Sequence, residues 1–136
     1  MANMKIEAIE GIGAVYGEKL RAAGVSDTDA LLAACRTPKQ RTELAAKAGL
    51  SAARLLKWAN MADLFRIHGI GPEYSELLEA AGVDTVPELA QRNPANLAAA
   101  MAEVQQAKRL TRRVPPVAEV TKWVAEAKQL PRALEY

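Results

Sequence analysis

The sequence predicts an all-α protein without strands. Half of the 136 residues are hydrophobic, only 4% are aromatic, and alanine is frequent, which favours closely packed helices over sheet. Residues 52–67 form the most apolar helical segment and leave only Arg54, Lys57, Asn60 and Asp63 for water. Because a helix that is apolar on nearly every side belongs inside a domain, we expect the chain to pack around this segment.

An internal repeat gives the second indication. Residues 9–25 align without gaps on residues 67–83, an offset of 58, and both stretches contain Gly-Ile-Gly, then a tyrosine, and then Ala-Ala-Gly-Val. Glycine on both sides of a sharp turn permits backbone dihedrals that other residues resist. We interpret the repeat as a duplication. The pair Lys122-Trp123 also echoes Lys57-Trp58, so the last helix stands where a third repeat would begin, although no third Gly-Ile-Gly follows it.

The first half of the chain contains five predicted helices. A short helix around Ile6 and Ile9 precedes the first turn, and the next helix spans 14–23 with Gly24 as a left-handed cap. Ser26, with Asp29 three residues later, is expected to cap a helix that ends near Cys35. Two further caps follow: Thr37-Pro38-Lys39-Gln40 predicts a helix to about Ala48, and Ser51 caps the central helix.

The second half follows the same logic and brings the total to about nine helices. Pro72 opens a helix that Gly82 ends, Thr85-Val86-Pro87-Glu88 predicts another start, and Asn93-Pro94 opens a long helix to about Lys108. Residues 110–116 contain Pro115-Pro116 and must interrupt the helix. Apolar residues then recur at helical spacing from Val117 to Leu130 and predict a final amphipathic helix.

These elements predict three segments. Residues 1–50 form a first unit, residues 51–109 form a second unit that shares the central helix 52–67, and residues 110–136 form a linker with a C-terminal packing helix.

The chain offers little for catalysis. Cys35 is the only cysteine and is expected to be a small packing residue at a helix end, while His68 is the only histidine, so neither a His/Cys metal cluster nor a nucleophile with a base is indicated. We therefore expect no enzyme activity, no metal and no cofactor. The sequence also shows no long apolar run, which predicts a cytoplasmic protein without a membrane partner.

The repeated pattern apolar-x-Gly-Ile-Gly-x-x-x-small-x-x-Leu, with Gly17 and Ser75 at the small position, resembles the helix-hairpin-helix motif. The segments LAAKAGL, LLKWANMADLFRI and GIGPEYSELLEAAGVDTVPELA resemble more closely a bacterial family, domain of unknown function 4332, as far as about Met101. The superfamily resemblance implies tandem units of the SAM-like, helix-hairpin-helix type. It also implies sequence-independent contact with nucleic-acid phosphates.

The physical basis of such contact is a turn whose amide protons are uncovered, followed by a helix that points its partly positive end the same way. The predicted nucleic-acid-binding residues are those of the two turns, the basic side chains beside them, and two arginines of the linker. They are Gly11, Ile12, Gly13, Lys19, Arg21, Arg66, His68, Gly69, Ile70, Gly71, Arg112 and Arg113.

The charge distribution leaves two functions open. Residues 1–34 and 59–103 carry net charges of −2 and −5 and contain both turns, while residues 35–58 and 104–136 carry +5 and +4. Where DNA-binding hairpins often have a basic residue, this chain has Val15 and Glu73. Nucleic-acid affinity comes chiefly from Lys and Arg. The module is thus predicted either to bind DNA nonspecifically or to bind another protein or itself without nucleic acid.

The basic residues outside the turns allow a separate nucleic-acid patch or contacts with the acidic segments. The candidates for such a patch fall into two sets: Lys39, Arg41, Lys47, Arg54 and Lys57, or Lys108, Arg109, Arg112 and Arg113.

Overall fold

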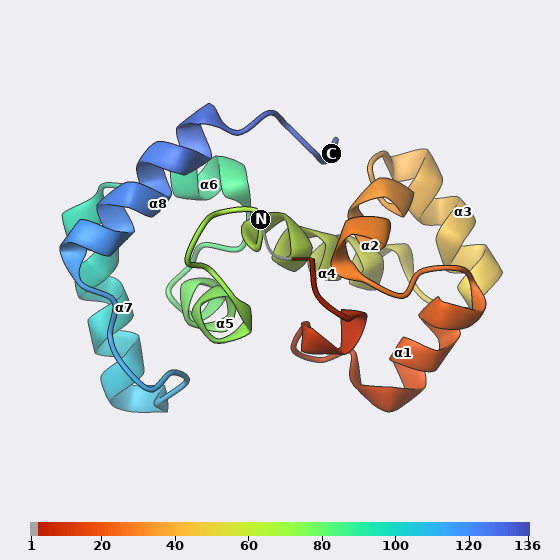
Figure 1. Ribbon diagram of the computed structural model, residues 1–136, viewed down its shortest axis with the longest axis horizontal. Coiled ribbons are helices and arrows are strands. Elements are labelled where there is room, and N and C mark those ends of the chain that lie inside the picture. The colour runs from red at the N-terminus through yellow and green to blue at the C-terminus, as the bar shows by residue number, and fades with distance from the viewer. Residues whose placement is uncertain (1–2) are drawn as a thin grey trace. The chain divides into compact units, whose positions relative to one another are not determined.

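The computed structural model describes residues 3–136, and within them every named element is a helix. Residues 1 and 2, which begin the first predicted unit, lie outside the described residues. The elements are a 3₁₀ helix η1 (Ile6–Ala8) and the α-helices α1 (Gly13–Ala22), α2 (Thr28–Ala34), α3 (Pro38–Ala48), α4 (Ala52–Leu64), α5 (Pro72–Ala80), α6 (Val86–Gln91), α7 (Pro94–Lys108) and α8 (Val117–Gln129) (Figure 1). The all-helical prediction is confirmed.

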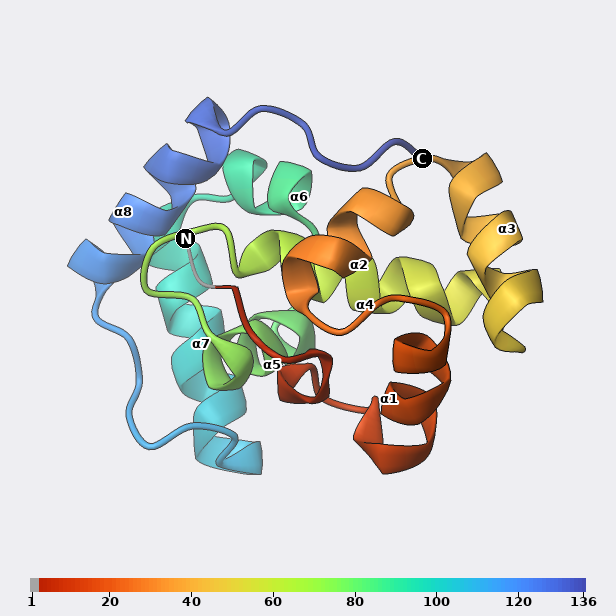
Figure 2. The ribbon, with the colours of Figure 1, turned by 45° about the vertical axis from the view of Figure 1, so that its right-hand side comes forward.

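The chain divides into two compact units. The first unit comprises the described residues up to Asp63 together with Arg132–Tyr136, and the second comprises Leu64–Pro131. The central helix α4 therefore belongs to the first unit except for its last residue. Helix α8 belongs to the second unit, where it packs on α6 and α7 (Figures 1 and 2). We call Arg132–Tyr136 the returning segment, because it follows the second unit in the chain but is part of the first.

Most helix starts follow the predicted capping chemistry. Thr37 and Gln40 form a reciprocal capping box at α3, and Ser51 Oγ accepts a hydrogen bond from the Arg54 amide at 3.0 Å. Thr85 caps α6 and Asn93 caps α7, each by accepting from the amide three residues on. These side chains satisfy amide protons that have no partner within the helix.

The predicted cap at Ser26 is wrong by one residue. The side chain of Asp27 accepts from the Ala30 amide at 2.8 Å and begins α2. The reason lies outside the helix: the Ser26 carbonyl accepts from the Ile6 amide, and Asp27 forms an isolated antiparallel bridge with Lys5. The preceding chain therefore holds Ser26 in an extended pairing and leaves Asp27 as the capping residue.

Helix α4 is buried more completely than the sequence predicts. It ends at Leu64 rather than Ile67, and Arg54 and Lys57 of its predicted water-facing strip are exposed. Asn60 and Asp63, however, are buried, and the prediction is wrong for both. The Asn60 amide oxygen accepts a hydrogen bond from the Tyr136 hydroxyl at 2.7 Å. The polar side chain is tolerated because it is hydrogen-bonded.

The duplication extends to four helices. Trp58 of α4 lies against Tyr16 of α1 with ring centroids 5.2 Å apart and planes at 57°. Trp123 of α8 lies against Tyr74 of α5 at 5.2 Å and 55°. The predicted small positions Gly17 and Ser75 are both buried. Helix α8 is thus the counterpart of α4, and each copy runs from a glycine turn to a tryptophan-bearing helix.

Arg41 of α3 holds the returning segment to the first unit. Its guanidinium is buried and donates to the carbonyl oxygens of Cys35 at 2.8 Å, Arg36 at 3.4 Å and Glu135 at 2.8 Å. The Glu135 amide in turn donates to the Arg36 carbonyl at 2.8 Å. Arg41 is therefore an internal cross-link and cannot contribute to a basic surface patch.

Cys35 is fully buried at the end of α2, as predicted for a packing residue. Burial raises the pKa of its thiol to about 11, against a smaller lowering by the charge of Arg41. Because the thiolate is the reactive form, we expect almost no labelling of the native protein by a thiol reagent at pH 8 and rapid labelling in urea.

The Cys35 thiol is neutral in the fold, so its contribution to stability should be lost as the pH rises from about 9 to about 11. Comparing the wild type with Cys35→Ala over this pH range isolates that contribution, and fast native labelling would contradict it.

Candidate nucleic-acid interface

The first glycine turn, Gly11-Ile12-Gly13, joins η1 to α1. Gly11 and Gly13 have φ values of +94° and +61°, in the left-handed region that glycine favours. The buried Ile12 anchors the turn, and its amide donates to the Ile9 carbonyl at 3.3 Å. This amide was predicted to bind phosphate, but its proton is already used to close the turn.

The second glycine turn, Gly69-Ile70-Gly71, joins α4 to α5 and repeats most of this geometry. Gly69 has a φ of +92°, and the Ile70 amide donates to the Ile67 carbonyl at 3.1 Å. The Ile70 amide, like that of Ile12, is therefore already engaged within its own turn. Gly71 differs from Gly13, because its φ of −119° is extended backbone that any residue adopts.

The two turns differ in the backbone amides that are left to donate a hydrogen bond at the start of the following helix. At the first turn, the amides of Gly13, Ala14 and Val15 open α1, and within residues 3–136 none of them donates a hydrogen bond to another backbone group outside the helix. The first turn of α1 has no acidic side chain. At the second turn, Pro72 has no amide proton and Glu73 places a carboxylate in the first turn of α5. The start of α1 therefore has more amide protons without a backbone partner, and fewer carboxylates, than the start of α5.

A tryptophan lies beneath each turn. A Cβ built on Gly11 would lie 3.9 Å from Trp58 Nε1, whereas one built on Gly69 would lie 3.1 Å from Trp123 Nε1. The second contact is tighter than ordinary van der Waals distance, so the indole there requires glycine for space as well as for backbone conformation.

We expect Gly69→Ala to destabilise the protein by ~2 kcal/mol, because the positive φ and the indole both oppose a side chain. The matched variant Gly13→Ala, at a φ of +61° with nothing within 4 Å, should cost ~1 kcal/mol. Urea unfolding followed by circular dichroism measures both. Equal effects would mean that the Trp123 contact adds nothing.

Arg54 supplies a cation beside the first glycine turn. Its guanidinium carbon lies 4.8 Å from the centre of the Tyr16 ring, and the side chain is exposed. Lys19 is also exposed, further along α1. Arg21, by contrast, pairs with the Glu7 carboxylate. Arg54 is therefore held in place by an aromatic residue, Tyr16, of the helix α1 that follows the turn.

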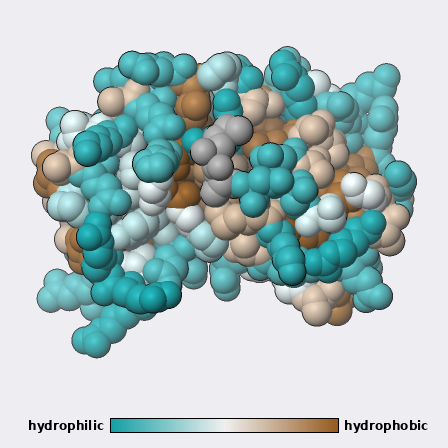
Figure 3. Space-filling view, viewed as in Figure 1, coloured by the Kyte–Doolittle hydropathy of each residue, from teal (hydrophilic) through white to brown (hydrophobic). Residues whose placement is uncertain are grey.

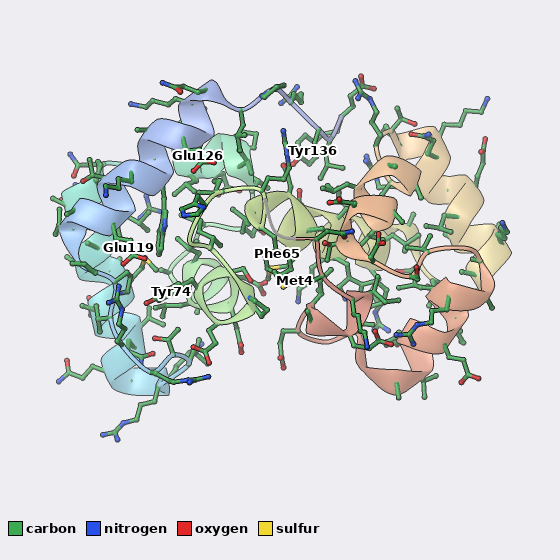
Figure 4. All side chains as sticks on the ribbon, in the orientation of Figure 1. Met4, Phe65, Tyr74, Glu119, Glu126 and Tyr136 are labelled. Carbon is green, nitrogen blue, oxygen red and sulfur yellow. The ribbon has the colours of Figure 1, made fainter. Side chains whose placement is uncertain are left out.

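Glu119 occupies the corresponding place beside the second glycine turn, because it precedes Trp123 by four residues as Arg54 precedes Trp58. Its carboxylate pairs with the Arg113 guanidinium, whose Nε donates to the Tyr74 hydroxyl at 3.0 Å. Figure 4 shows Glu119 and Tyr74 near one another. The equivalent positions therefore hold side chains of opposite charge, and Arg113 pairs with the carboxylate at the second turn.

Other carboxylates surround the second glycine turn. Glu126 accepts from the His68 backbone amide at 3.0 Å. With Glu119 and Trp123 it lines a cavity of about 530 Å³ beside the turn. Arg112 pairs with Glu73 at 3.5 Å, with both side chains largely exposed. The linker arginines thus meet acidic residues within the second unit, which is one of the arrangements that the charge pattern left open.

The remaining predicted residues do not gather at one site. Arg66 donates to the Pro131 carbonyl at 3.0 Å, and the basic sets divide between the units, with Arg41 buried. The sequence prediction of turn contacts did not include Arg54. One sequence signal for Arg54 was available: it precedes Trp58 by four residues, as Glu119 precedes Trp123. This spacing indicates a position beside the glycine turn only once α4 is packed on α1.

Two further kinds of feature are absent from the described residues. No helix in the described part of the chain is long and apolar enough to cross a membrane. Among residues 3–136 there is no group of three or more His, Cys, Asp or Glu side chains placed to hold a metal ion. The face in Figure 3 is mainly hydrophilic, with smaller hydrophobic areas between.

Fold and site together define a class of all-helical proteins in which a glycine turn and a tryptophan-bearing helix occur twice. The chain belongs to the family described as Domain of unknown function (DUF4332), whose model matches residues 10–130. This confirms the resemblance to that family drawn from the sequence and extends it through α8. No curated protein and no solved structure matches the chain significantly.

Proposed function

We propose that the protein is a non-enzymatic module of two helix-hairpin-helix units that binds DNA without sequence preference, through the first glycine turn alone. The observation that carries this proposal is the reversal of charge at equivalent positions, Arg54 beside the first turn and Glu119 beside the second. An anion at the first turn meets amide protons and a guanidinium. At the second turn it meets the carboxylates of Glu73 and Glu119, with which the nearby Arg112 and Arg113 already pair.

The proposed phosphate contacts position the protein on DNA but do not read its base sequence. Backbone amides of Gly13, Ala14 and Val15 approach a phosphate oxygen at the positive end of α1, and Arg54 approaches the same or a neighbouring phosphate. Neither group reads a base. The nearby Tyr16 ring packs on Trp58 and serves to hold Arg54 rather than to stack on nucleotides.

We expect Arg54→Glu to weaken binding of a short DNA duplex about tenfold at low salt and to lower the slope of log affinity against log salt by about 1. Fluorescence anisotropy at several salt concentrations measures both quantities.

The matched control is Arg112→Glu, which reverses another exposed arginine that already pairs with Glu73 at the second turn. It should change the affinity much less. If the two reversals weaken binding equally, net charge rather than the first glycine turn determines the affinity, and if Arg112→Glu weakens it more, the basic linker is the site. If the wild type does not bind at low salt, the module is an interaction scaffold without nucleic acid.

A further inference from the structure

The returning segment occupies a seat on the first unit that binds both backbone groups of Glu135. The Glu135 amide donates to the Arg36 carbonyl at 2.8 Å, and the Glu135 carbonyl accepts from Arg41 at 2.8 Å. Both backbone groups of one residue are thus bound, as they would be by a neighbouring strand. The Glu135 side chain is exposed and takes no part in this pairing.

Side chains on either side of Glu135 complete the fit. Leu134 is 1% exposed. The Tyr136 hydroxyl donates to the buried amide oxygen of Asn60 at 2.7 Å. The seat therefore takes an apolar residue, one paired backbone residue and a tyrosine in succession. We call the surface formed by Arg36, Arg41 and Asn60 the tail seat.

The chain reaches this seat through a short link. Helix α8 ends at Gln129, Leu130 is extended at φ −68° and ψ 134°, and Pro131 is the last residue of the second unit. The link fixes the segment to the second unit, while every contact named above is made to the first. None of these contacts requires that the seat and the segment belong to one copy, because a second copy presents the same groups.

We propose that the tail seat also accepts the returning segment of a second copy, giving a dimer in which two copies exchange Arg132–Tyr136. Such an exchange keeps the Glu135, Leu134 and Tyr136 contacts and changes only the dihedrals of the link, which is why segment exchange is a low-cost route to a dimer. The inference does not rest on DNA binding.

To test this, the full chain is concentrated, unfolded in urea and refolded at high protein concentration. Light scattering then measures its molecular mass. We expect a dimer that persists for hours after dilution, because its release requires both segments to leave their seats. A protein that remains entirely monomeric after this treatment overturns the proposal.

Two variants at one position identify the contact. Glu135→Pro removes the amide proton given to Arg36, both in the closed monomer and in the exchanged dimer, so it should change the rate of exchange rather than the dimer fraction. We expect the diluted dimer to dissociate at least about fivefold faster, as for the loss of one hydrogen bond at each seat. Glu135→Ala keeps that proton and should leave the dissociation rate unchanged. A dimer whose dissociation rate is unaffected by Glu135→Pro has another interface and contradicts the exchange. Circular dichroism on each variant confirms that the helices are retained.

Discussion

Arg41→Met is expected to destabilise the protein by ~3 kcal/mol, since hydrogen bonds from a charged donor contribute about 1.5–3 kcal/mol each and are not additive. The side chain is 4% exposed and its guanidinium serves three carbonyl oxygens. Methionine fills similar space but leaves those oxygens without their donor. Chemical unfolding followed by circular dichroism measures the difference.

The control for this variant is Arg36→Ala. Arg36 is exposed and contributes its backbone carbonyl, which alanine retains. We expect a change within about 0.5 kcal/mol, as for most surface substitutions. If Arg36→Ala were as harmful as Arg41→Met, charge in this region rather than the buried hydrogen bonds would determine stability.

Trp123→Ala is expected to cost about 3–5 kcal/mol, the range for truncating a buried large aromatic side chain. The indole is 1% exposed, contacts the Tyr74 ring, and approaches Gly69 closely. Its loss removes the residue on which the second glycine turn rests. Urea unfolding should show the loss, and the neighbouring variant Lys122→Ala, at an exposed position, should be nearly neutral.

A Trp123→Ala protein as stable as the wild type would show that α8 is not the structural counterpart of α4. The equivalent change Trp58→Ala provides the comparison within the first unit. Because Trp58 is similarly buried against Tyr16, its truncation should have an effect of the same order.

The helices could be predicted from the sequence because their signals are local. A cap such as Thr37 and its partner Gln40 lie three residues apart, and a proline at the first helical position acts on its own backbone. The error at Ser26 arose where a distant segment, the chain around Ile6, competes for the same backbone. Capping chemistry alone does not contain that information.

The burial of polar residues could not be predicted for the same reason. Asn60 is paired with Tyr136, and Arg41 with Glu135. Both partners lie more than 70 residues away in the sequence, so periodicity assigns these positions to solvent. A helix pattern reports which side chains are polar but not which of them will find a partner inside the fold.

The candidate site was predicted in part. The sequence indicates both glycine turns, but it does not show that Ile12 and Ile70 use their own amides or that Arg54 lies on Tyr16. Those facts depend on the closed turn and on the packing of α4 against α1. The block charges likewise place both turns in acidic segments, whereas the packed structure sets the Arg54 guanidinium over Tyr16 at the first turn and pairs Arg113 with Glu119 at the second.

The central claim is that the first glycine turn binds phosphate and the second does not. Amide chemical shifts recorded while a short DNA duplex is added test it most directly. We predict that the amides of Gly13, Ala14 and Val15 move with increasing DNA, while those of Gly69, Gly71 and Glu73 stay in place. Shifts confined to the second turn or to Arg109–Arg113, or no shifts at low salt, would contradict the claim.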